Sequence, residues 1–166
     1  MMILPELSVI LAEELAKLLV ANDWTITCAE SCTGGGVAVA ITSIAGSSQW
    51  FERGFITYSN QAKTDLVGVD PATLKQYGAV SQQVVEQMAQ GAAKQANAEL
   101  AISISGIAGP DGGSEEKPVG TVWFGLTLNS HTQSEKQLFQ GNRHQVREQA
   151  VHFALNYCIK MLQSIN

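Results

Sequence analysis

Two side chains that could act as nucleophiles, Ser31 and Cys32, stand directly before three consecutive glycines in the segment A-E-S-C-T-G-G-G at residues 29–36. The segment follows a predicted strand and precedes a predicted helix, which is where ligands usually bind in an open α/β sheet. Backbone N–H groups at such a turn can hold an anion or an oxyanion. The candidate substrate-binding residues of this turn are Thr33, Gly34 and Gly35.

The glycine spacing matches none of the common motifs. It contains neither the P-loop pattern G-x-x-x-x-G-K-[ST] nor the dinucleotide pattern G-x-G-x-x-G. It also lacks G-x-S-x-G, the pattern of the hydrolase nucleophile elbow. Close packing of a helix on a strand needs small residues too, so a purely structural turn explains the glycines equally well.

A serine nucleophile needs a base, and a lysine is the best candidate in this chain. No local pattern connects a histidine to Ser31, and none indicates a metal site. Burial disfavours the charged form of an amine, so a buried lysine can release its proton near neutral pH. Lys63, in Y-S-N-Q-A-K, follows a predicted strand, and Tyr58 at the end of that strand can donate or relay a hydrogen bond. The three histidines of the chain are His131, His144 and His152.

Both assignments have simpler alternatives. A lone lysine on a short helix is usually a solvated surface charge. Cys32 could replace Ser31 as the nucleophile, although a buried cysteine beside a strand is more often only a small apolar residue. The residue types alone leave these alternatives open.

A second glycine-rich loop, S-G-I-A-G-P-D-G-G, also follows a predicted strand. Its backbone N–H groups could reach the same crevice as Ser31. The charged flank S-E-E-K is as compatible with a mobile lid as with a plain surface loop. The candidate substrate-binding residues of this loop are Ser105, Gly106 and Gly109.

Two arginines form a third candidate feature. Arg143 and Arg147 are four residues apart in the first turns of the last predicted helix and share one of its faces. Cations are unfavourable at the N-terminal end of a helix dipole, and a bound phosphate would relieve that conflict. Surface charges balanced by acidic neighbours such as Glu148 are the alternative.

The elements that must position these residues alternate between strands and helices. Alternation with one late hairpin predicts an α/β fold, a three-layer α/β/α sandwich with a mixed sheet, in a single domain spanning residues 1–166. The predicted helices cover residues 5–22, 33–45, a short turn carrying Lys63, 71–77, 81–97 and a final helix capped by Asn142; the predicted strands cover 25–30, 51–59, 101–105, 119–128 and 134–139.

The composition narrows the class of protein. A length of 166 residues, 45% of them apolar, indicates a globular domain. The net charge of −5 argues against the basic face that binding to a nucleic acid needs. No signal peptide, membrane span or metal site is indicated. The three cysteines are odd in number and form no CxxC pair, which predicts reduced thiols and a cytoplasmic protein.

Taken together, A-E-S-C-T-G-G, Y-S-N-x-x-K, and S-G-I-A-G-P-D-G-G with the following K-P-V-G-T-V resemble the C-terminal domain of the competence- and damage-inducible protein CinA. The resemblance covers nearly the whole chain. It implies an α/β/α amidase domain, here in a stand-alone form, that converts nicotinamide mononucleotide and water to nicotinic acid mononucleotide and ammonia in pyridine nucleotide recycling. It also implies Ser31 as nucleophile, with Lys63 and Tyr58 as its catalytic partners, no cofactor, and the small-molecule substrate as partner; a homodimer is compatible with it.

The residues and the resemblance lead to one mechanism. Neutral Lys63 takes the proton of Ser31, whose oxygen attacks the carboxamide, while N–H groups of the glycine turn hold the oxyanion. We expect Arg143 or Arg147 to hold the 5′-phosphate. The competing class is a non-catalytic nucleotide-binding or regulatory module in which Ser31 only donates a hydrogen bond, and a redox role for Cys32 is a more distant alternative.

Overall fold

The computed structural model describes residues 4–165. Its sheet has five strands in the order β2-β1-β3-β4-β5. Strand β1 pairs in parallel with β2 and β3, whereas β4 is antiparallel to both β3 and β5, so the sheet is mixed as predicted. The strands are β1 (Ile26–Glu30), β2 (Phe55–Ile56), β3 (Leu100–Gly106), β4 (Thr121–Leu128) and β5 (His131–Leu138).

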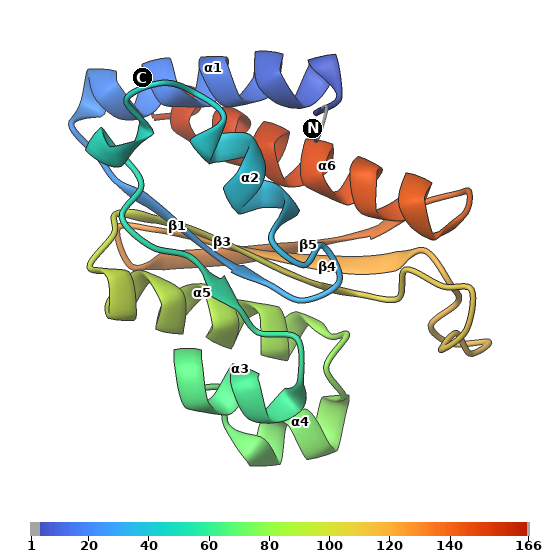
Figure 1. Ribbon diagram of the computed structural model, residues 1–166. Coiled ribbons are helices and arrows are strands. Elements are labelled where there is room, and N and C mark those ends of the chain that lie inside the picture. The colour runs from blue at the N-terminus through green and yellow to red at the C-terminus, as the bar shows by residue number, and fades with distance from the viewer. Residues whose placement is uncertain (1–3, 166) are drawn as a thin grey trace.

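Helices cover both faces of the sheet (Figure 1). Helices α1, α2 and α6 lie on one face and α3, α4 and α5 on the other, which confirms the three-layer sandwich. Their bounds are α1 (Glu6–Asn22), α2 (Gly36–Thr42), α3 (Asn60–Val67), α4 (Pro71–Tyr77), α5 (Gln82–Ala96) and α6 (Arg143–Gln163), with a short 3₁₀ helix at Ser47–Gln49. None of these helices is long and apolar enough to span a bilayer.

Successive side chains of β3 point to opposite faces of the sheet and pack into two separate hydrophobic cores. Ile102 and Ile104 point to the face covered by α1, α2 and α6, whereas Ala101 packs with Val84 and Met88 of α5. This is the period of two that a strand imposes on its side chains. Full burial of a valine, isoleucine or methionine side chain contributes about 1.5–3 kcal/mol to the stability of the fold, so both helical layers are held firmly to the sheet.

Local capping signals explain where most helices begin. Asn142 forms a capping box with Gln145 at the start of α6. Ser81 caps α5, and Ser59 caps α3 by accepting a hydrogen bond from the N–H of Ala62 at 3.0 Å. The Ser59 cap matters for the site, because it starts the helix that carries Lys63.

Three predicted boundaries were wrong. The strand predicted at 51–59 is reduced to Phe55–Ile56 with one isolated bridge at Phe51, because the chain then leaves the sheet edge. Helix α2 begins at Gly36 because Gly34 and Gly35 have φ of +57° and +103°, which a right-handed helix cannot accommodate. The hairpin turn is Asn129-Ser130, so His131 belongs to β5 rather than to the turn.

Candidate active site

Ser31 and Lys63 come together where β1 ends. The N–H of Ser31 donates to the carbonyl of Ile104 at 3.0 Å, which continues the pairing of β1 with β3 by one residue. The Nζ of Lys63 lies 3.3 Å from the Oγ of Ser31. Ser31 is 9% exposed and Lys63 only 1%. The lysine is therefore a buried side chain in contact with the serine rather than the solvated surface charge of the simpler alternative.

The surroundings of Lys63 favour a neutral amine. Desolvation by burial lowers its pKa, against a smaller opposing effect of Cys32. It forms no ion pair among the described residues. Besides Ser31, its nitrogen contacts the carbonyl oxygens of Thr57 at 2.9 Å and Tyr58 at 3.5 Å. A neutral amine can donate its two N–H bonds to these carbonyls and keep its lone pair for the serine proton.

Cys32 is less suited to nucleophilic chemistry. Its side chain is buried, and desolvation raises its pKa to about 12. The thiolate is the reactive form of cysteine, so this environment keeps the residue inert near neutral pH. The same cause raises the pKa values of Cys28 and Cys158.

The N–H groups of the glycine turn are already engaged. Gly34 donates to the carbonyl of Ser31 at 3.0 Å and Gly36 to that of Thr33 at 3.1 Å. Gly35 donates to the carboxylate of Glu30 at 3.1 Å. The expectation that the glycine N–H groups hold an oxyanion is therefore not met in this conformation.

Two other groups of the same turn stay unpaired. Among the described residues, no hydrogen bond joins the N–H of Cys32 or Thr33 to another residue. The Oγ1 of Thr33 is buried and has no partner there either. Sequence reasoning placed the donors at the glycines; the structure leaves them on the two residues that directly follow the serine.

Sequence reasoning also missed Glu30. Its side chain is fully buried and its carboxylate accepts hydrogen bonds from backbone N–H groups at the start of α2. The one available signal was an acidic residue at the end of the strand, immediately before the nucleophile. Charged residues are rarely buried without partners, so an acid in that place predicts a local set of donors.

Tyr58 contributes two different groups. Its carbonyl oxygen faces Lys63 and lies 3.5 Å from the Oγ of Ser31. Its side chain is 58% exposed, and the phenol oxygen accepts a hydrogen bond from Arg143 at 3.1 Å. The guanidinium of Arg143 also donates to the carbonyl of Gly109 at 2.9 Å. Tyr58, Arg143 and the second glycine-rich loop thus meet beside the serine–lysine pair.

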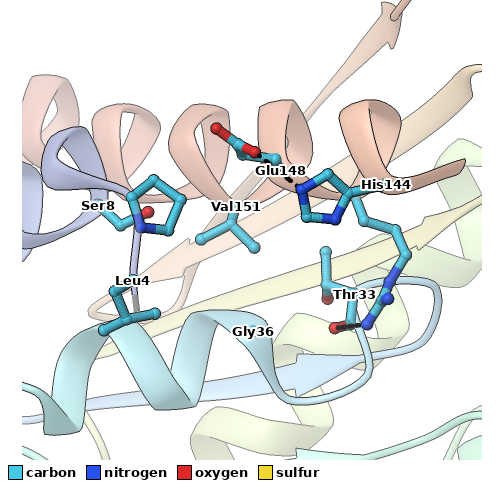
Figure 2. A pocket seen from close by; sticks show the side chains of 9 residues that line it. Leu4, Ser8, Thr33, Gly36, His144, Glu148 and Val151 are labelled. Atoms are coloured by element: carbon cyan, nitrogen blue, oxygen red, sulfur yellow. Dashed lines mark hydrogen bonds and ion pairs between the residues drawn. The ribbon is translucent and has the colours of Figure 1, made fainter. Parts of the chain in front are cut away.

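Arg147 is less exposed than Arg143, and it forms hydrogen bonds with the turn that follows Ser31. Its guanidinium donates to the carbonyls of Cys32 at 3.0 Å and Thr33 at 3.1 Å. These carbonyls stabilise the cation near the helix N-terminus without a bound anion. Next to them is a pocket of about 150 Å³ between α1, α2 and α6 (Figure 2). It is lined by Leu4, Pro5, Ser8, Thr33, Gly36, His144, Arg147, Glu148 and Val151.

The remaining predicted residues lie on β3 and the loop that follows it. Ser105 is buried near the end of β3, and it lies at the same end of the sheet as Ser31 because β1 and β3 are parallel. Gly106, the last residue of that strand, packs closely against Val122 of β4. The loop is fastened to the other helical layer, because the Nζ of Lys117 donates to the carbonyl of Tyr77 at 2.8 Å. In the part of the chain that the structure describes, no three His, Cys, Asp or Glu side chains cluster as metal ligands.

A mixed sheet between two helical layers, with a buried serine–lysine pair where a parallel strand ends, defines an α/β/α protein with a potential nucleophile and base. The chain belongs to the CinA C-terminal domain family, whose model matches residues 9–162. It is 57% identical over 151 residues to the nicotinamide-nucleotide amidohydrolase PncC of Enterobacter agglomerans, covering 90% of this chain and 92% of that one. It is 58% identical over 146 residues to the PncC of Escherichia coli K12, covering 87% and 88%.

The fold of solved relatives agrees with this assignment. The crystal structure of the competence/damage inducible protein CihA from Agrobacterium tumefaciens matches with a TM-score of 0.93 and 40% sequence identity. The match covers 97% of this chain and 99% of that one. Both the layers and the strand order described above are therefore those of the CinA superfamily.

Proposed function

We propose that this protein is an amidase that hydrolyses the carboxamide of nicotinamide mononucleotide, giving nicotinic acid mononucleotide and ammonia in the recycling of pyridine nucleotides. The names of its relatives support the substrate and the class of reaction. The observation that carries the proposal is the buried Nζ of Lys63 at 3.3 Å from the Oγ of Ser31. Three cysteines held as buried free thiols support a reducing, cytoplasmic location.

The reaction begins with proton transfer from Ser31 to neutral Lys63. The carbonyls of Thr57 and Tyr58 hold the two N–H bonds of the amine and direct its lone pair at the serine. The serine oxygen then bonds to the carboxamide carbon, and the resulting ammonium of Lys63 returns its proton to the departing nitrogen, which leaves as ammonia. Water hydrolyses the acyl-serine ester with Lys63 again as base, which releases the acid and restores Ser31.

The oxyanion of each tetrahedral intermediate needs donors that the turn has not already used. The N–H groups of Cys32 and Thr33 fit this role, because they follow the nucleophile and have no other partner among the described residues. In the nucleophile elbow of other hydrolases, one donor is likewise the N–H of the residue after the serine. The unpaired hydroxyl of Thr33 is a further group through which this turn can contact the substrate.

We assign the 5′-phosphate to Arg143 rather than Arg147. Arg143 is exposed and donates to the phenol of Tyr58 and to the carbonyl of Gly109, and the main-chain carbonyl of Tyr58 contacts the serine–lysine pair. The guanidinium of Arg147 already donates to the carbonyls of Cys32 and Thr33. Tyr58 would then orient Arg143 and contact the substrate through its exposed ring, and Ser105, Gly106 and Gly109 would border the substrate at the end of β3 and in the loop that follows it.

Ammonia release from nicotinamide mononucleotide by the purified protein tests the proposal. Turnover is expected from the wild type and not from Ser31→Ala. A protein that binds the nucleotide but releases no ammonia would contradict the amidase assignment and point to a binding module. Activity that survives in Ser31→Ala would contradict the assignment of the nucleophile.

A further inference from the structure

The carboxylate of Glu30 is the most completely enclosed acidic group of the site, yet the mechanism above does not use it. Glu30 ends β1 directly before Ser31, and its side chain is fully buried. Its Oε2 accepts hydrogen bonds from the N–H groups of Gly35 and Val37, each at 3.1 Å, and its Oε1 from that of Ala38 at 2.9 Å. No lysine or arginine among residues 4–165 forms an ion pair with it.

The start of α2 compensates this buried acid. The first N–H groups of a helix have no partner within the helix, and that end carries a partial positive charge. The N-cap position of α2 is Gly35, which has no side chain to cap the helix. Glu30 supplies the missing acceptor from the end of the neighbouring strand. The helix terminus that the glycine pattern suggested as an anion site is therefore occupied by the protein's own carboxylate.

Glu30 also reaches the base through its main chain. Its carbonyl oxygen accepts hydrogen bonds from the N–H of Thr57 at 2.8 Å and from the Thr57 hydroxyl at 3.3 Å. The carbonyl of Thr57 in turn accepts from the Nζ of Lys63 at 2.9 Å. One residue thus connects to both sides of the serine–lysine contact, through its carboxylate to the loop of Ser31 and through its carbonyl to the segment that holds Lys63.

We propose that Glu30 is a positioning residue: its carboxylate clamps the start of α2 and holds residues 31–35 in the turn that sets the Ser31–Lys63 contact and keeps the N–H groups of Cys32 and Thr33 free for the oxyanion. This inference rests on the proposed amidase function. A clamp of this kind acts on the transition state more than on substrate binding, because the phosphate contact at Arg143 lies on a different helix.

Glu30→Gln tests the clamp with little change in shape. Glutamine has one acceptor oxygen, and its NH₂ group would face backbone N–H groups that also donate, so at least one of the three hydrogen bonds from the backbone is lost; the thiol of Cys28 is a fourth donor to the carboxylate, at 3.5 Å. Removal of one oxyanion donor in other hydrolases lowers kcat by about 10²–10³-fold. We expect Glu30→Gln to lower kcat about a hundredfold and to leave KM within about threefold.

Val37→Ala is the matched control. Val37 is buried in the same first turn of α2, so its truncation weakens the packing of the helix but keeps both the Glu30 carboxylate and the backbone N–H groups that donate to it. Both variants are assayed well below their melting temperatures, with folding checked by circular dichroism. A loss of kcat in Glu30→Gln that Val37→Ala does not share supports the clamp. Equal losses in the two variants, or wild-type kcat in Glu30→Gln, overturn it.

Two further measurements cover the remaining cases. If Glu30→Gln does not fold, Glu30→Asp keeps the charge but is one methylene shorter, and a loss of kcat of at least about tenfold is expected; wild-type kcat there overturns the proposal. Hydrogen exchange over residues 31–38 needs no turnover, and it should accelerate more in Glu30→Gln than in Val37→Ala. A wild type that releases no ammonia would refute the amidase function, whereas unchanged exchange in Glu30→Gln would refute the clamp.

Discussion

Burial of Lys63 couples the activity and the stability of this protein to the same proton. Its side chain is 1% exposed and its pKa is lowered by desolvation. Between that lowered pKa and the ordinary lysine value, the unfolded chain binds more protons at this position than the folded protein does. The free energy of unfolding must therefore rise with pH across this window, by up to about 1.4 kcal/mol per pH unit for one proton.

Lys63→Met removes this proton and keeps a side chain of similar length. The variant also leaves the carbonyl of Thr57 without its donor at 2.9 Å, which costs about 1–3 kcal/mol at every pH. At any single pH, the stability difference between the wild type and Lys63→Met therefore combines the lost hydrogen bond with the effect of the proton. Only the dependence of this difference on pH isolates the effect of the proton. We expect the stability of the wild type relative to Lys63→Met to increase with pH, since titrating groups that do not interact with Lys63 cancel in the difference.

Urea denaturation of both proteins between about pH 6 and 10 measures this slope. In the same range, kcat/KM of the wild type should fall as pH decreases below the lowered pKa of Lys63, because only the neutral amine can accept the serine proton. Parallel stability curves for the two proteins would refute the lowered pKa. A kcat/KM that stays constant down to acidic pH would refute the role of Lys63 as base.

Three further comparisons between pairs of variants separate the proposed roles. Ser31→Ala should lower kcat more than about a thousandfold with folding intact, whereas Cys32→Ala should change it little; the reverse result would make the thiol the nucleophile. Lys63→Arg should be nearly as inactive as Lys63→Ala, because a guanidinium stays protonated, and substantial activity in it would mean that position 63 needs only a positive charge. Arg143→Ala should lower kcat/KM for nicotinamide mononucleotide about ten- to a hundredfold through KM and leave the riboside, which has no phosphate, unaffected. Arg147→Ala should lower kcat/KM for both substrates alike and lower the melting temperature, because it removes the hydrogen bonds to the carbonyls of Cys32 and Thr33. An effect of Arg147→Ala that depends on the phosphate would exchange the roles assigned to the two arginines.

Local signals made much of the fold predictable. The Asn142 cap and the helix Pro71–Tyr77 were predicted at the residues where the structure has them, and the helix predicted at 81–97 begins directly after its cap, Ser81. Each depends on side-chain contacts within a few residues of the helix end, which the sequence contains directly. The approach of Lys63 to Ser31 agrees with the rule that loops at the carboxyl ends of parallel strands lie at the same end of the sheet, although the residue types alone left a solvated surface lysine open.

The remaining features depend on contacts between distant residues or on backbone conformation. Arg147 was one of the two arginines predicted to hold the phosphate, but its hydrogen-bond partners are the carbonyls of Cys32 and Thr33, which lie more than a hundred residues earlier in the chain. The engagement of the glycine N–H groups depends on the positive φ angles of Gly34 and Gly35. A motif gives the residue types of such a turn, whereas the direction of each N–H is known only when φ and ψ are known.

The position of the base in the fold indicates which part of the site opens most easily. Strand β2 is a two-residue edge strand that pairs only with β1, through Phe55 and Ile56. Just beyond it, Thr57 is held by Glu30 and itself holds Lys63. Ser31, by contrast, is anchored to β3 in the centre of the sheet. Regions with few buried contacts open at a lower free-energy cost than the core. We therefore expect local opening to separate the base from the nucleophile while the sheet stays intact, so that activity is lost before global unfolding.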